Sequence, residues 1–251
     1  MNKKAVPFVL MRGGTSKGVF LRNEYVPKDR SELVPFLLDL FGSPDRRQID
    51  GLGGADKLTS KVAILGKPTL VGCDVDYLFG QVGIQAPEVD FKLNCGNLTA
   101  AVGMYAIQEG LVDAVEGTTA VRIHNVNTGK VITAHVPVRD GEPLVEGELA
   151  IGGVPGTGAP IVLDFSQVTG AITGALLPLG ATAVALDVPG HGTFEVSVVD
   201  GANLVVFVAA EALGMRGTET PDEIDGNVAL TPTINAIRSE VAHRVGMGPY
   251  W

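Results

Sequence analysis

Cys95 and Lys61 are two side chains whose residue types and surroundings make them candidates for a chemical role. Cys95 stands in the polar stretch Asn94 to Asn97, immediately before an apolar run from Leu98 to Leu111. That run is apolar on nearly every side, so it predicts a helix enclosed by protein. The first N–H groups of a helix lack intrahelical partners and attract anions, which favours a thiolate there. Such a thiol suits a nucleophile, a redox site or simple packing.

Lys61 stands where a glycine-rich loop, residues 50–60, meets an apolar run of strand length, residues 61–65. A lysine acts as a base only when its amine is neutral, and burial beside such a run favours that form. Most lysines are solvated surface charges, so this ordinary interpretation of Lys61 also stays open.

The stretch from Met11 to Gly18 predicts a glycine-rich turn between two strands. Its glycines let backbone N–H groups approach a ligand, and its polar side chains suit carboxylates or phosphates. Those side chains are Arg12, Thr15, Ser16 and Lys17. An ordinary hairpin turn is the alternative. The stretch matches neither a nucleotide P-loop nor the dinucleotide fingerprint.

The apolar periodicity predicts helices at 31–41, 98–111 and about 231–245, with many short strands between them. From Thr118 onward, short strands alternate with turns rich in Gly, Pro, Asn and Asp, which indicates a second, antiparallel β-rich unit. We therefore expect two domains, 1–117 with a central helix near 96–112, and 118–251. The strands expected in the second domain are 120–126, 131–138, 144–151, 161–165, 184–187, 193–199 and 204–209.

Composition limits the possible partners and the compartment. The formal net charge of -9 argues against a nucleic-acid or anionic-membrane surface. The two cysteines make no disulfide framework, and neither a leader nor a long apolar span is evident, so we expect a cytoplasmic protein. Cys73 is interpreted as a packing residue. The four histidines are not at metal-ligand spacing, so no metal site is expected.

Several motifs, in order along nearly the whole chain, resemble the methylaconitate isomerase (PrpF) family. They are Arg12-Gly13-Gly14-Thr15-Ser16-Lys17-Gly18, Thr59-Ser60-Lys61-Val62-Ala63-Ile64, Asp74-Val75-Asp76-Tyr77-Leu78-Phe79, Asn94-Cys95-Gly96-Asn97 and Phe194-Glu195-Val196-Ser197. The resemblance implies an α+β, diaminopimelate-epimerase-like fold, in which two similar β-rich domains each wrap a central helix and the active site lies between them. It also implies isomerisation or tautomerisation of unsaturated di- or tricarboxylic acids such as methylaconitate or oxalomesaconate, with neither metal nor organic cofactor.

By this resemblance, Lys61 and Cys95 are the catalytic acid–base pair. Lys61 is the preferred proton abstractor, although the two roles are interchangeable at this stage. The backbone N–H groups of Gly96 and Asn97 would hold a substrate carboxylate or the developing enolate. The other residues expected to bind substrate are Arg12, Thr15, Ser16, Ser60, Asn94 and Asn203. Relatives also suggest a homodimer.

Two departures from the family pattern qualify these expectations. Leu204 follows Asn203 where relatives usually have proline, and the chain ends at Trp251, where relatives continue through a further segment. We therefore expect the second domain to lack its C-terminal part. A non-catalytic truncated homologue or a carboxylate-binding module is the alternative function. Racemase chemistry with two cysteines is disfavoured, because Cys73 and Cys95 fall in the same expected domain.

Overall fold

The computed structural model describes residues 5–248, which form two compact units that divide between Gln167 and Val168. The division falls later than the expected boundary after residue 117. The reason lies in strand pairing, because β6 (Gly117–Asn125) runs parallel to β4 (Val75–Val82) and so extends the first sheet. The expected domains, 1–117 and 118–251, therefore differ from the observed units.

A nine-stranded sheet forms the first unit, in the order β1-β2-β3-β4-β6-β7-β11, with β5 paired to β4 and β8 paired to β7. The pairs β2–β3 and β4–β6 are parallel, and the other pairs in this sheet are antiparallel. The remaining strands are β1 (Val9–Gly13), β2 (Ser16–Arg22), β3 (Lys61–Gly66), β5 (Val89–Asp90), β7 (Lys130–Arg139), β8 (Glu142–Pro143) and β11 (Val162–Asp164).

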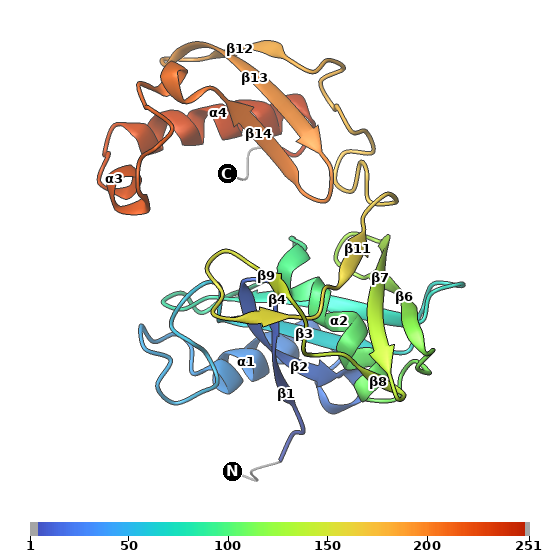
Figure 1. Ribbon diagram of the computed structural model, residues 1–251. Helices are drawn as coiled ribbons and strands as arrows, with labels where there is room; N and C mark the ends of the chain where they lie inside the picture. Colours follow the sequence, from blue (N-terminus) through green and yellow to red (C-terminus); the bar gives the residue numbers. More distant parts are fainter. Residues whose placement is uncertain (1–4, 249–251) are drawn as a thin grey trace. The chain divides into compact units, whose positions relative to one another are not determined.

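Helix α2 (Gly96–Gln108) is the central helix that the apolar run predicts, and strands of the first unit surround it in Figure 1. Its buried side chains pack with strand residues that include Phe20, Tyr77 and Val121. The helix also approaches β7 closely, since a Cβ added at Gly103 would lie 2.8 Å from a methyl group of Val136. A helix packed this tightly on several strands holds its N-terminus in a fixed place.

Helix α1 (Arg30–Phe41) packs with a second apolar cluster of the sheet. Its buried residues Leu33, Leu37 and Phe41 share this cluster with alternate residues of β2 and β3, such as Leu21 and Ile64. Because neighbouring residues of a strand point to opposite faces, β2 and β3 contribute to both cores. These strands are therefore buried on both sides. A short 3-10 helix, η1 (Asn23–Tyr25), follows β2.

The segment expected as a strand over 144–151 is mostly irregular, which corrects that prediction. Only β9 (Leu149–Ala150) forms there, and it pairs with β10 (Thr157–Gly158) in a separate two-stranded sheet. The backbone at Gly147 lies against this returning segment, since an added Cβ there would lie 2.6 Å from the Ala159 Cα. The chain therefore folds back on itself instead of continuing as a strand.

The second unit combines a three-stranded antiparallel sheet with a helix, as Figure 1 shows. Ile237 and Val241 of the helix pack on alternate residues of the sheet, including Leu186 and Val196. The elements are β12 (Val184–Val188), β13 (Gly192–Asp200), β14 (Leu204–Val208), η2 (Ala210–Leu213), α3 (Pro221–Asp225) and α4 (Leu230–Arg244). Within residues 5–248, no helix combines the length and apolar character needed to cross a bilayer. Residues 249–251, on which the expectation about the chain end partly rests, lie outside this description.

Ionisation of the buried Tyr105 hydroxyl is expected to lower the stability of the first unit at high pH. Burial, and secondarily the charge of Glu109, raises the pKa of Tyr105 to about 12. An unfolded tyrosine ionises near pH 10, so this stabilisation is fully present below about pH 10 and is lost as the pH rises through about 12. Tyr105→Phe keeps the ring that packs on Phe20 at a centroid distance of 5.3 Å, and removes the ionisable group.

Between pH 9 and pH 11, we expect the free energy of unfolding of Tyr105→Phe to fall by about 1 kcal/mol less than that of the wild type. Urea unfolding at the two pH values measures the difference. Equal losses in the wild type and in Tyr105→Phe would contradict the prediction.

Candidate active site

The turn between β1 and β2 packs directly on the first turn of α2. A Cβ added at Gly13 would lie 2.4 Å from the Asn97 carbonyl oxygen, and one added at Gly14 would lie 2.3 Å from the Asn97 Oδ1. Only glycine fits such an approach of backbone to backbone. The Asn97 amide also donates a hydrogen bond to the Thr15 Oγ1 at 3.0 Å. These contacts join the glycine-rich turn to the helix start.

Cys95 is the N-cap of α2, and its sulfur accepts a hydrogen bond from the Leu98 N–H at 3.4 Å. The Ser16 hydroxyl lies 3.8 Å from the Cys95 Sγ, and Ser16 is only 2% exposed. The side chain that caps α2 is thus the thiol itself. The sulfur thus lies between a helix N-terminus and a hydroxyl, both of which can donate to a thiolate.

Tyr77 lies in the core near this helix start. Burial, and secondarily the charge of Cys95, raises the pKa of Tyr77 well above its usual value. Its hydroxyl is buried, and an interaction with the Thr99 side chain only partly offsets this rise. Tyr77 therefore stays protonated at neutral pH and adds no charge beside Cys95.

Lys61 is buried at the start of β3, with only 7% of its surface exposed. Its Nζ donates to the Gln81 Oε1 at 2.6 Å and lies 5.4 Å from the centroid of the Phe79 ring. No ion pair joins Lys61 to a carboxylate among the described residues. Because its side chain is buried and hydrogen-bonded, Lys61 is not the solvated surface charge of the ordinary interpretation.

Gly18 connects the start of β3 to the start of α2. It is the register partner of Lys61 in the parallel pair β2–β3. A Cβ added at Gly18 would lie 2.8 Å from the Leu98 Cδ1 and 3.0 Å from the Lys61 carbonyl oxygen. Leu98 belongs to the first turn after Cys95, so Lys61 and Cys95 lie at the same end of the first unit.

Two glutamines that the sequence did not single out hold the segment before Lys61. The Ser60 hydroxyl donates to the Gln48 Oε1 at 2.7 Å, and the Ser60 carbonyl accepts from the Gln81 Nε2 at 3.0 Å. Gln48 is 1% exposed and has a φ of 45°, so an uncommon backbone conformation accompanies this contact. No motif marks either glutamine, because their role follows from strand register and loop packing.

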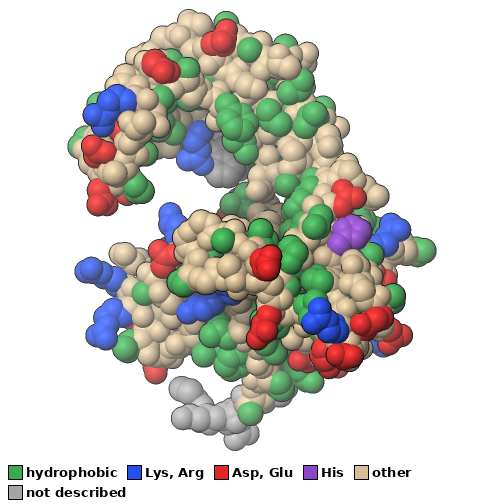
Figure 2. All heavy atoms as spheres, viewed as in Figure 1, with side chains coloured by type: hydrophobic (Ala, Val, Ile, Leu, Met, Phe, Trp, Pro, Cys, Tyr) green, Lys and Arg blue, Asp and Glu red, His purple; other side chains and the backbone are tan. Residues whose placement is uncertain are grey.

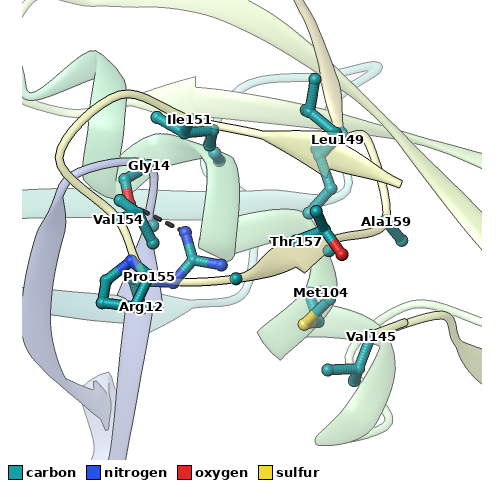
Figure 3. A pocket seen from close by; sticks show the side chains of 15 residues that line it. Arg12, Gly14, Met104, Val145, Leu149, Ile151, Val154, Pro155, Thr157 and Ala159 are labelled. Atoms are coloured by element: carbon teal, nitrogen blue, oxygen red, sulfur yellow. Dashed lines mark hydrogen bonds between the residues drawn. The ribbon is translucent and has the colours of Figure 1, made fainter. Parts of the chain in front are cut away.

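Arg12 lines a pocket that is otherwise mainly apolar, as Figure 3 shows. Its Nη1 donates to the Gly14 carbonyl at 2.8 Å, and no ion pair joins it to an acidic side chain of the described chain. The cavity measures about 140 Å³. Its apolar walls come from α2 and from the segment around β9 and β10, and include Met104, Val145, Leu149, Ile151, Val154 and Ile161. Neither Lys61 nor Cys95 lines this pocket.

A family model described as "PrpF protein" matches residues 3–249. The chain belongs to the PrpF family. A curated relative named "Putative isomerase YraM", from Bacillus subtilis (strain 168), is 52% identical over 232 residues, which cover 92% of this chain and 63% of the relative. A relative named "3-methylitaconate isomerase", from Eubacterium barkeri, is 50% identical over 242 residues, which cover 96% of this chain and 63% of the relative.

A crystal structure of methylitaconate-delta-isomerase matches with a TM-score of 0.79 and 49% identity, covering 97% of this chain and 62% of that one. This match confirms the α+β, diaminopimelate-epimerase-like fold that the motifs predicted. The chain spans about 63% of the length of these two curated relatives. The expectation that the second domain lacks its C-terminal part stays a prediction.

The other expected site residues take different positions. Gly96 and Asn97 begin α2, as expected for donors of backbone N–H groups. Asn94 is buried, and its Oδ1 accepts hydrogen bonds from the Thr99 hydroxyl and the Asn125 amide. Asn203 belongs to the second unit, in the turn between β13 and β14, whereas the other expected site residues belong to the first unit. The buried contacts of Asn94 and Ser60 suit support of the site, and their direct binding of substrate stays a prediction.

The surface carries charges of both signs without a continuous basic patch on the visible face, as Figure 2 shows. Within residues 5–248, no three His, Cys, Asp or Glu side chains gather as potential metal ligands. The groups that the first unit brings together are thus an amine, a thiol, hydroxyls and backbone N–H groups. They suit proton transfer beside a bound carboxylate.

The contact between Gly13 and α2 predicts that Gly13→Ala weakens the first unit. The added methyl group would meet the Asn97 carbonyl and force the turn away from the helix start. We expect a loss of about 1–3 kcal/mol in the free energy of unfolding, measured by urea titration. Gly152→Ala is the matched control, since a Cβ there meets nothing within 4 Å. A Gly13→Ala protein as stable as this control would contradict the predicted contact.

Proposed function

We propose that this protein is a cofactor-independent isomerase that moves a proton, and with it a double bond, within an unsaturated di- or tricarboxylic acid. The observation that supports the proposal is the placement of a buried lysine and a helix-capping cysteine at the same end of the first unit. Cys95 caps the buried helix α2, and Lys61 is buried at the start of β3, with Gly18 and Leu98 between them. The isomerase names of the relatives support the same reaction class.

The reaction follows from the acidity of a C–H bond next to an alkene that is conjugated with a carboxylate. When neutral Lys61 removes this proton, the C–H electron pair delocalises over the alkene and the carboxylate. The Cys95 thiol then delivers a proton to the far carbon, so the double bond moves by one position. Lys61 is left as an ammonium and Cys95 as a thiolate, and proton exchange with solvent restores both. The reverse assignment of acid and base gives the same product.

Substrate binding is proposed to rest on hydrogen-bond donors around this pair. The first N–H groups of α2, at Gly96 and Asn97, would hold a carboxylate or the developing negative charge. Arg12 has a guanidinium without an acidic partner among the described residues, and it would bind a second carboxylate. Thr15 and Ser16 of the glycine-rich turn would bind the remaining carboxylates, and Asn203 stays a proposed substrate ligand.

The substrates we propose are methylaconitate, oxalomesaconate or a similar polycarboxylate, and the 3-methylitaconate isomerase relative supports this class. The reaction needs no metal or organic cofactor. We also propose a cytoplasmic location, and the two free cysteines support it. We further propose a homodimeric assembly.

Incubation with methylaconitate, methylitaconate or oxalomesaconate in deuterated water tests the reaction. Proton NMR should show a shifted double bond and solvent deuterium on carbon. Cys95→Ser and Lys61→Ala should each slow this exchange by about 10²–10⁴-fold, the usual contribution of one general acid or base. Cys73→Ser and Lys67→Ala are matched controls, because they change the same residue types away from the proposed pair, and should keep wild-type rates.

Absence of exchange with every acid in this panel would overturn the isomerase proposal for this chain. Binding of these acids without exchange would favour the alternative of a carboxylate-binding module. Isothermal titration calorimetry on the same samples separates those two outcomes.

Arg12 is predicted to contribute mainly to substrate binding. Arg12→Leu removes a charge-assisted hydrogen bond, so we expect KM to rise by about 10–100-fold with a smaller change in kcat. Arg12→Lys should fall between the wild type and Arg12→Leu, because lysine keeps the charge but loses the two-pronged geometry. Arg139→Leu, at the exposed end of β7, is the matched control. An unchanged KM in Arg12→Leu would remove Arg12 from the proposed binding set.

A further inference from the structure

We propose that Gln81 is the positioning residue for Lys61, holding its amine with an uncharged oxygen so that Lys61 can alternate between its ammonium and neutral forms. The catalytic part of this inference rests on the proposed function. The hydrogen bond between Lys61 and Gln81 is present whatever the reaction.

Gln81 faces Lys61 because of strand register. The two residues are direct partners in the antiparallel pair β3–β4, so their side chains lie on the same face of the sheet. The distance from Lys61 Nζ to Gln81 Oε1 is 2.6 Å. With Lys61 only 7% exposed, this short contact restricts where the amine can lie.

The Gln81 side chain has one orientation that satisfies its neighbours. Its amide nitrogen donates to the Lys57 carbonyl at 3.1 Å and to the Ser60 carbonyl at 3.0 Å. These two bonds use both N–H groups of the amide, which leaves the oxygen to accept from Lys61. Rotation of the amide by half a turn would place N–H groups against the amine and oxygen against two carbonyls. The backbone before Lys61 thus selects the acceptor that Lys61 meets.

The absence of charge on Gln81 matters for a lysine that must lose its proton. A carboxylate at this distance would stabilise the ammonium and hold the proton on Lys61. An amide oxygen accepts an N–H from either the ammonium or the neutral amine. The Phe79 ring, with its centroid 5.4 Å from Nζ, attracts the ammonium only modestly. Gln81 therefore fixes the position of Lys61 without placing a negative charge beside its amine.

The other groups around Lys61 are consistent with this balance. The titratable residues on the adjoining segments are Lys17 on β2, Asp56 and Lys57 in the preceding loop, Tyr77 on β4, Asp90 on β5, which is the register partner of Gln81, and Cys95 at the start of α2. Two of these are further cations, and among the described residues none is a carboxylate in ion-pair contact with Lys61. Gln81 is thus the side chain that directly contacts the proposed base. Substitution to glutamate replaces its amide nitrogen by oxygen and adds a negative charge at the same place.

Competitive labelling of Lys61 tests the coupling without relying on activity. The protein is treated with trace acetic anhydride over a range of pH, and the acetylated Lys61 peptide is quantified by mass spectrometry. Gln81→Glu should move the midpoint of Lys61 labelling to higher pH by about one to three units, as expected for an opposite charge in contact. Gln108→Glu introduces the same charge at an exposed position near the end of α2 and should leave the midpoint unchanged.

Activity measurements test the positioning role. Gln81→Met keeps the side-chain length and removes the acceptor, so kcat should fall by at least about tenfold while KM changes little. In the dependence of kcat on pH, the limb on which kcat rises as Lys61 loses its proton should move to higher pH in Gln81→Glu. The size of this move should match the change in the labelling midpoint. Circular dichroism and urea unfolding confirm that each variant is folded before it is compared.

An unchanged Lys61 labelling midpoint in folded Gln81→Glu would overturn the coupling. An unchanged kcat in Gln81→Met would overturn the positioning role. If the wild type turns over none of the acids in the panel, the proposed function fails, whereas the labelling result still decides whether Gln81 controls the charge of Lys61.

Discussion

The close approach of the Gly13–Gly14 turn to the first turn of α2 is the contact on which the rest of the first unit depends. At this point the backbone of β1 and the Asn97 carbonyl lie too near each other for any side chain to fit between them. The contact places Ser16 beside the Cys95 sulfur and carries Gly18, with its partner Lys61, to the same helix end. Chemistry at this end of the unit therefore depends on the packing of glycine as much as on the reactive side chains.

A buried helix within a strongly curved set of strands suits this arrangement for a physical reason. The side chains of α2 pack on several strands at once, so the helix cannot shift without opening the core. Its N-terminus, with N–H groups that lack intrahelical partners, then becomes a rigid donor site. In this frame the lysine is placed by strand register, and the cysteine by the helix that it caps. Each proposed proton-transfer group is held by a different element, and the two elements meet at Gly18 and Leu98.

The sequence predicted the parts that have a local signal. The apolar run after Cys95 predicted α2, periodicity predicted α1 and α4, and the glycine-rich turn was found between β1 and β2. Long-range pairing has no such signal, so the parallel pair β4–β6 was missed and the domain boundary fell elsewhere. The same limit explains why the sequence did not single out Gln81 and Gln48, because their hydrogen-bond partners are distant in sequence. The segment 144–151 was expected as a strand, but the backbone at Gly147 lies against residues 158–159, where the chain folds back.

The capping role of Cys95 connects helix structure to the charge of the thiol. A sulfur that accepts from the Leu98 N–H accepts more strongly when it carries negative charge. Loss of a proton from this sulfur would therefore tighten the first turn of α2, and its return would loosen that turn. Protection of the Leu98 amide against hydrogen exchange would then report the protonation state of the Cys95 sulfur. In the proposed reaction, the backbone at the start of α2 would thus respond to each proton transfer.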